Sequence, residues 1–177
     1  HLHLPLQAGS DAVLRAMNRH YTTAQFAQLL ADVRAAVPGV AISTDIIVGF
    51  PGETEEDFAA GMDFVRAMGF ARMHVFPYSA RRGTPAAQRT DQVPPVVRKE
   101  RAARMQALAE ELAEAYHRSM LGSVAEVLFE TCADGVSDGL TETYVRVYTD
   151  APVTRGEMVS VRLTHLYRDG VWGALVE

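Results

Sequence analysis

The chain has 177 residues, of which 48% are hydrophobic, and its formal net charge is −5. This composition supports a packed core and excludes a wholly disordered chain, and no apolar run is long enough to cross a bilayer. The single cysteine, Cys132, excludes an internal disulfide and an iron–sulfur cluster held by several thiolates of this chain. It also fits a reducing, cytoplasmic setting. Residues 122–177 hold four arginines against nine acids, whereas residues 1–121 hold thirteen basic and thirteen acidic side chains, so the composition gives no general support for nucleic-acid binding.

The first section predicts a strand and two helices. Residues 1–7, HLHLPLQ, alternate apolar and polar side chains, as a strand with two unlike faces does. The chain opens within this run and not with methionine, so we expect it to be a fragment of a longer protein. We expect Ser10 to cap a helix that begins at Asp11. Thr22 and Gln25 have capping-box spacing and start the second helix.

A second strand, at about residues 41–49, ends in the turn GFPG. Thr54 then offers a cap for a further helix. Carboxylates in a first helical turn complement the helix dipole, and we place four acids there: Glu53, Glu55, Glu56 and Asp57. A third alternating strand covers residues 72–79, and a long helix runs from Pro95 to about Met120.

From Gly122 the periodicity changes to two, and the stretches VAEVLFE, ETYVRVY, MVSVRLT and GVWGALVE predict short strands of a small antiparallel β-barrel. The β-α-β-α-β order before it predicts a parallel α/β sheet with fewer strands than such sheets usually have. We therefore interpret residues 1–96 as the C-terminal half of a β/α barrel, residues 97–121 as a linking helix and residues 122–177 as the small barrel.

One face of the three parallel strands is unusually polar for a barrel interior, which is normally apolar. Buried polar groups pair with one another or bind a ligand. Asp45 opposite Arg72 or His74 is a candidate ion pair, and mutual pairing is equally open for His1 and His3. The strand ends, where barrel enzymes place their sites, carry residues 7–10, 49–53 and 77–82, and Gly49 and Gly52 permit a close approach of a ligand to the backbone.

Several common site motifs are absent from the sequence. No GK[ST] follows the glycine turn, and GxGxxG is missing, so neither a Walker loop nor a dinucleotide fingerprint is present. HExxH, CxxC and GxSxG are also missing, which removes support for zinc and serine hydrolysis.

The stretches HLHLPLQAGSDAVLRAMNRHYT, STDIIVGFPGETEEDF and MHVFPYSARRGTPAA resemble the radical S-adenosylmethionine (SAM) tRNA methylthiotransferases. The third stretch is similar to the branch that acts on N6-threonylcarbamoyladenosine. The part from Gly122, including GLTETYVRVY, is similar to the family's C-terminal TRAM domain, a small OB-like barrel. The resemblance covers nearly the whole chain and implies a radical SAM half-barrel followed by a TRAM domain.

The resemblance also implies an activity for the complete protein. It would add a methylthio group to N6-threonylcarbamoyladenosine next to the anticodon, using SAM, two [4Fe–4S] clusters, and an electron donor such as flavodoxin or ferredoxin. Its partner would be the anticodon stem-loop of tRNA, without a membrane. Both cluster-binding cysteine sets are missing from this sequence, so we expect this chain alone to hold no metal cluster, to contain no catalytic residue and to be inactive.

Carried over residue by residue, the resemblance implies a SAM-binding wall at the ends of the first two strands: Gln7, Ser10, Asp45, Ile47 and Gly49. Ile47 and Gly49 match the GxIxG element of radical SAM enzymes, with Asp45 in place of its first glycine. Substrate RNA would meet basic and aromatic residues of both sections: Tyr78, Arg81, Arg82, Arg146 and Arg162.

Alternatives remain open at this point. The aromatic side chains of Tyr144, Tyr148 and Trp172 can stack bases, although such residues more often belong to the core or rim of a small barrel. The whole chain can also be a non-catalytic RNA-binding or regulatory fragment. An aldolase-like barrel enzyme would need a reactive lysine or a metal site, and the only lysine, Lys99, is on the long helix.

Overall fold

The structure is a computed structural model and describes residues 1–176. Contacts divide the chain within its longest helix into two compact units, one of residues 2–113 and one that begins at Glu114. The elements of the first section are β1 (Leu2–His3), α1 (Asp11–Ala16), α2 (Thr23–Ala36), β2 (Ile42–Val48), α3 (Glu55–Met68), β3 (Arg72–Pro77), the 3₁₀ turn η1 (Pro85–Gln88) and α4 (Pro95–Met120). The remaining strands are β4 (Val124–Ala133), β5 (Val136–Thr141), β6 (Arg146–Thr149), β7 (Met158–Tyr167) and β8 (Gly170–Leu175).

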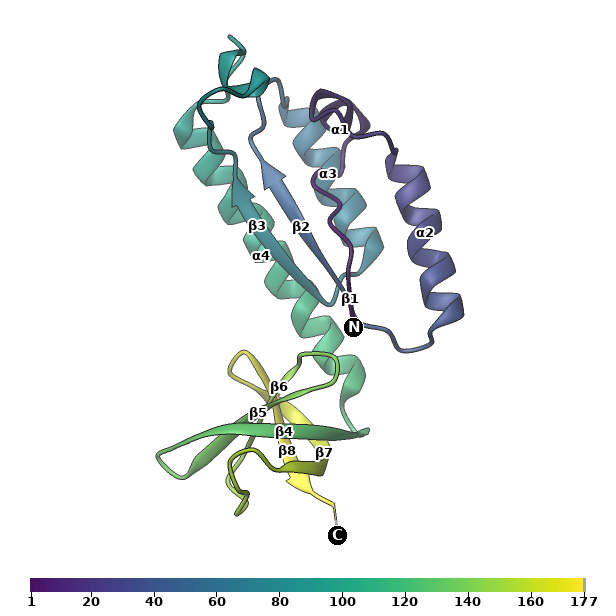
Figure 1. The fold of residues 1–177 in the computed structure, drawn as a ribbon, viewed down its shortest axis with the longest axis vertical. Coiled ribbons are helices and arrows are strands. Elements are labelled where there is room, and N and C mark those ends of the chain that lie inside the picture. The colour runs from purple at the N-terminus through teal and green to yellow at the C-terminus, as the bar shows by residue number, and fades with distance from the viewer. Residues whose placement is uncertain (177) are drawn as a thin grey trace. The chain divides into compact units, whose positions relative to one another are not determined.

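The first unit contains a parallel sheet in the order β1-β2-β3 (Figure 1). This confirms the predicted α/β class. Helices α2, α3 and α4 cover one face of the sheet and bury its apolar side chains in one core, which includes Leu6, Ile46, Phe58, Val65 and Leu108. The opposite face carries the polar side chains, as the alternation of β2 and β3 requires.

The first predicted strand is shorter than expected, because Pro5 lacks an N–H and interrupts the ladder. The buried Thr44 hydroxyl bridges the gap: it accepts a hydrogen bond from the Leu6 N–H at 2.9 Å and donates one to the Leu4 carbonyl at 2.8 Å. Pairing resumes at Gln7, which forms an isolated bridge with Ile46.

The predicted N-cap residues precede α1, α2 and α3, and two of the three make a side-chain capping hydrogen bond. Thr22 and Thr54 each form the predicted capping box, with Gln25 and Asp57 respectively. Ser10 is the N-cap residue of α1, which begins at Asp11 as predicted, but its hydroxyl makes no capping hydrogen bond to α1. The hydroxyl instead donates a hydrogen bond to a carboxylate on α3.

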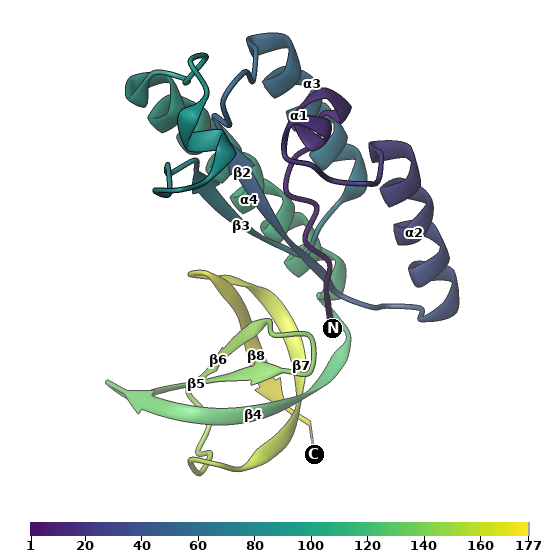
Figure 2. The ribbon, with the colours of Figure 1, turned by 45° about the horizontal axis from the view of Figure 1, so that its top comes forward.

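Five strands form a closed barrel in the order β4-β5-β6-β8-β7, and they curve around a common interior (Figure 2). The predicted barrel is confirmed, but it is mixed, because β6 and β8 pair in parallel. The sequence missed β5, whose VSDGLT run lacks a clear apolar alternation. Gly139 is required there, since a Cβ at this position would lie 2.3 Å from the Leu128 carbonyl oxygen.

Helix α4 belongs to both cores. Met105 and Leu108 lie in the core of the sheet unit, and Tyr116 and Met120 pack against the barrel core. The division at residues 96 and 121 stays a prediction. Within residues 1–176, no helix has the length and apolar character that a membrane span needs.

A pair of glycines gives a test of the packing between α3 and the loop before α1. A Cβ on Gly9 would lie 2.7 Å from the Gly61 carbonyl oxygen, whereas a Cβ on Gly61 would find Gly9 at an ordinary 3.8 Å. We expect Gly9→Ala to destabilise the fold by about 1–3 kcal/mol because backbone must move. Gly61→Ala should stabilise α3 by about 0.5–1 kcal/mol. Urea unfolding of both variants measures the difference, and equal effects would contradict this packing.

Candidate functional site

A cleft of about 530 Å³ lies at the carboxyl ends of the parallel strands. Its size is that of a small-molecule site. The structure brings together five of the predicted site residues in its lining: Gln7, Asp45, Ile47, Tyr78 and Arg81. It adds residues that the sequence analysis did not single out, among them Arg19 and Phe50. Aromatic rings, arginines and a carboxylate therefore share one concave surface.

Asp45 is held at this cleft by His3. The His3 ring contacts the Ser43 hydroxyl through Nδ1 at 2.9 Å and the Asp45 carboxylate through Nε2 at 3.3 Å. The predicted pairing of Asp45 with Arg72 or His74 is therefore wrong. His74 is its neighbour across the strands, but β1 supplies the contacting side chain.

Gln7 has a left-handed backbone, with φ of +72°. Its N–H donates to the Asp45 carbonyl at 2.9 Å, and its carbonyl accepts from the Ile47 N–H at 2.8 Å. For a residue with a Cβ this conformation costs about 1–2 kcal/mol, and such strain is concentrated at functional sites. The backbone beside the cleft is thus fixed by β2 on both sides of Gln7.

Gly49 and Ser10, also predicted to bind the cofactor, do not line the cleft. Gly49 has φ of +72°, and a Cβ there would lie 2.4 Å from Arg98 Cγ. A Cβ on Gly52 would meet the Arg89 guanidinium at 2.5 Å. Both glycines therefore make room for side chains of this chain, and the closeness of Gly49 to a ligand stays a prediction.

The carboxylate of Glu53 fills the turn after β2. It accepts the Gly49 N–H and lies 2.9 Å from Arg101 Nη1, with both side chains only 6% exposed. Arg101 also donates to the Glu53 carbonyl at 3.0 Å. Burial raises the pKa of Glu53, against the opposing effects of the Gly49 N–H and Arg101. The prediction that Glu53 belongs to the first turn of α3 is wrong, because the helix begins at Glu55.

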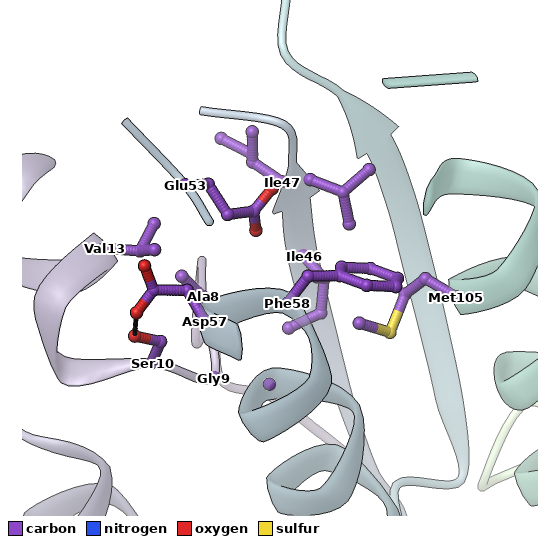
Figure 3. A pocket seen from close by; sticks show the side chains of 12 residues that line it. Ala8, Gly9, Ser10, Val13, Ile46, Ile47, Glu53, Asp57, Phe58 and Met105 are labelled. Carbon is purple, nitrogen blue, oxygen red and sulfur yellow. Dashed lines mark hydrogen bonds between the residues drawn. The ribbon is translucent and has the colours of Figure 1, made fainter. Parts of the chain in front are cut away.

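Ser10 donates a hydrogen bond to Asp57 at 2.7 Å (Figure 3). Both line a small internal void of about 10 Å³, as does Glu53. Burial favours a higher pKa for Asp57, but hydrogen bonds from Ser10 and Thr54 outweigh it and lower this pKa. Ser10 thus connects the start of α1 with the start of α3.

The remaining predicted residues of the first unit follow β3, and only some of them line the cleft. Arg81 lines the cleft, while the exposed Arg82 does not. Tyr78 packs edge-to-face on Phe50, with ring centroids 5.2 Å apart. Its buried hydroxyl has no hydrogen-bond partner among residues 1–176, which is an unsatisfied polar group of the kind that ligand sites leave for a partner.

The two predicted arginines of the barrel are on strands that β8 separates. Arg146 pairs with Asp138 and Asp169, and Arg162 donates to the Gly122 carbonyl at 3.0 Å. The carboxylates beside Arg146 offset its charge. The prediction that these two arginines contact RNA remains untested.

An aromatic patch consists of the buried Tyr148 on β6, His165 and Tyr167 on β7, Arg168 in the turn that follows, and Trp172 on β8. Tyr167 contacts Trp172 edge-to-face at 4.9 Å and Tyr148 at 5.1 Å. The Arg168 guanidinium covers both tyrosine rings, at 5.4 and 5.1 Å from their centroids. Burial and a hydrogen bond to Asp169 raise the pKa of Tyr148 to about 12. Tyr144, 56% exposed on the turn before β6, is not one of these contacts.

The donor set does not fit an iron–sulfur cluster. Cys132 is exposed, and within residues 1–176 no three His, Cys, Asp or Glu side chains are grouped as a metal site requires. The cleft does fit the adenosyl part of SAM, because it offers apolar and aromatic walls with a few polar groups.

Comparisons with known proteins show which proteins this chain resembles. Residues 1–65 match the profile of the radical SAM superfamily. The chain is 43% identical to a tRNA-2-methylthio-N(6)-dimethylallyladenosine synthase of Jannaschia sp., over 99% of this chain and 39% of the relative. It is 39% identical to the threonylcarbamoyladenosine tRNA methylthiotransferase MtaB of Bacillus subtilis, over 100% of this chain and 41% of the relative.

Among solved structures, the coproporphyrinogen III oxidase HemN of Escherichia coli, a radical SAM enzyme, matches with a TM-score of 0.52 and 19% identity. The match covers 78% of this chain and 40% of that protein, and it supports the fold alone. The chain spans about two fifths of the length of the two curated relatives named above.

The buried ion pair gives a stability test. We expect Glu53→Ala to lower the free energy of unfolding by about 3 kcal/mol, because it leaves the Arg101 charge buried without its partner. Glu56→Ala, an exposed acid of the same segment, should change it by less than about 0.5 kcal/mol. If urea unfolding shows that both variants lose the same free energy of unfolding, Glu53 acts only as an acid at the start of the helix.

Asp57 gives a pH test. Its folded pKa lies below the unfolded value of 3.8, so its stabilising effect is present above that value and is lost as the pH falls through the folded pKa. The difference in the free energy of unfolding between the wild type and Asp57→Asn should therefore shrink as the pH falls from about 5 to about 3. Urea unfolding across this range measures it, with Asp63→Asn as the exposed control. A difference that does not change with pH would contradict a lowered pKa of Asp57 in the folded state.

Proposed function

We propose that this chain, which is homologous to the tRNA methylthiotransferases, is the C-terminal portion of such an enzyme and forms one wall of its SAM site. The observation that carries the proposal is the cleft at the strand ends, in which Gln7, Asp45 and Ile47 meet. Homology over essentially the full length of this chain supports it.

In this proposal the chain's residues bind and orient the cofactor. Asp45, held by His3, accepts hydrogen bonds from ribose hydroxyls, and the Gln7 amide contacts the polar end of the ligand. Ile47 and Phe50 pack against the adenine and exclude water from it. In the complete protein, one bound SAM would supply the hydrogen-abstracting radical when a cluster gives it an electron, and a second SAM would supply the methyl group. The required clusters are bound outside these residues, so the chain alone is inactive.

The proposed substrate is N6-threonylcarbamoyladenosine next to the anticodon of tRNA. The stretch MHVFPYSARRGTPAA supports it, and Tyr78 and Arg81 of this stretch line the cleft. N6-dimethylallyladenosine is the second candidate, favoured by the slightly higher identity to that class of relative. An external electron donor, such as flavodoxin or ferredoxin, would serve the complete protein.

The proposed RNA contact of the second unit is the aromatic patch. Stacking on aromatic rings tolerates any base, and an arginine over the rings adds affinity for the backbone. This assignment accommodates an acidic barrel, since stacking does not depend on net charge. A non-catalytic RNA-binding chain is the alternative function, and the aromatic patch favours it.

Titration of S-adenosylhomocysteine into the chain tests the cofactor wall. We expect saturable one-to-one binding that Asp45→Ala weakens about tenfold, through loss of a hydrogen bond to a charged group. Asp63→Asn, an exposed change in charge on α3, should leave the affinity unchanged. A chain that binds RNA but not this nucleoside would support the non-catalytic alternative.

Nucleoside analysis of tRNA from a strain lacking the gene identifies the substrate as part of the same test. Loss of methylthio groups from threonylcarbamoyladenosine alone is the expected result. Loss from dimethylallyladenosine alone would move the proposal to the second candidate, and no loss from either would overturn it.

A further inference from the structure

Arg98, near the start of α4, contacts the residues that follow two neighbouring strands, β2 and β3. Its Nη1 donates to the Tyr78 carbonyl at 2.7 Å. Its stem lies against the turn after β2, where Arg98 Cγ occupies the space that a Cβ on Gly49 would need. One side chain thus touches both the β2 turn and the end of β3.

The two segments that Arg98 connects carry the wall of the cleft. Phe50 follows Gly49, Tyr78 follows β3, and the rings of Phe50 and Tyr78 pack edge-to-face in the lining. The Tyr78 N–H donates to the Val48 carbonyl at 2.8 Å. The backbone of Tyr78 is therefore fixed at its N–H by β2 and at its carbonyl by α4.

A second arginine holds the same turn one helical turn later, since residues three apart lie on one side of a helix. Arg101 contacts Glu53, which accepts the Gly49 N–H. The two arginines differ in burial: Arg101 is buried within the fold, and Arg98 is half-buried at its edge. Removal of the Arg98 guanidinium therefore leaves the core contacts of α4 in place.

We propose that Arg98 is a positioning residue that fixes the turn after β2 relative to the end of β3, and thereby sets the affinity of the cleft for its adenosyl ligand. The part of this proposal that concerns ligand affinity rests on the proposed function. Arg98 does not line the cleft, so it acts through Gly49 and Tyr78 and makes no ligand contact.

Three variants of the 177-residue chain separate this role from a general structural one. Arg98→Met keeps a stem of similar length against Gly49 but removes the donor to Tyr78. Arg98→Lys keeps a charge and a donor. Lys99→Met removes a positive charge from the neighbouring exposed position of α4 and serves as the control.

Hydrogen exchange without ligand measures the strand ends directly. In Arg98→Met we expect the Gly49 and Tyr78 amides to exchange at least about fivefold faster, while α2 amides and the unfolding temperature stay as in the wild type. Arg98→Lys should restore protection in part, and Lys99→Met should change nothing. Unchanged exchange at both strand ends, or faster exchange throughout the unit, would overturn the positioning role.

Titration with S-adenosylhomocysteine tests the ligand part. Arg98→Met should weaken binding about tenfold, with partial recovery in Arg98→Lys. Faster exchange with unchanged affinity would overturn the link to the ligand. If the wild-type chain does not bind this probe, the proposed function fails, and the link between Arg98 and ligand affinity fails with it. The hydrogen-exchange measurement still decides whether Arg98 fixes the strand ends.

Discussion

The ion pair between Glu53 and Arg101 is the interaction on which the first unit depends most. Two charges with 6% exposed side chains must be fully satisfied, because desolvation of each is expensive. The chain meets most of this requirement with its own backbone: the Gly49 N–H donates to the carboxylate, and the Glu53 carbonyl accepts from the guanidinium. Only Arg101 Nε has no partner among residues 1–176. The pair therefore fixes the turn after β2, the start of α3 and the register of α4 together.

The sheet shows why the cleft forms at this place. Its apolar side chains are buried under three helices, which leaves the polar side chains of the same strands on the other face. At the carboxyl ends the chain turns away into loops, and the side chains that follow each strand converge there. Gln7 and Tyr78 follow β1 and β3, and Asp45 lies within β2, so the cleft is a product of parallel pairing and not of any one motif.

Much of this arrangement could be predicted from local signals. Turn residues identified β2, and capping spacing identified α2 and α3, because each signal depends on neighbours a few residues away. The signals failed where a distant partner decided the outcome. Ser10 has the sequence of a helix cap, yet it bonds Asp57, and Glu53 stands among helix-start acids, yet it bonds Arg101.

The same reasoning applies to the site. The polar strand face was evident from periodicity, but the partner of Asp45 depended on which side chain of the sheet reached it, and that was His3. Aromatic residues of the barrel were visible, whereas their assembly around Arg168 required the β6–β8 pairing. A buried arginine in a charged helix, such as Arg101, gives a sequence signal too weak to separate from its neighbours.

The Gly49 turn has a consequence for the thermodynamics of recognition. Its amide is already occupied by an internal carboxylate, and the backbone at Gln7 is fixed by β2. Gln7 and Phe50, the residue after Gly49, line the cleft, so a ligand there would meet walls whose conformational entropy was lost when the chain folded. Preorganised walls of this kind reduce the ordering cost of binding. A molecule of modest size can then use most of its contact energy as affinity.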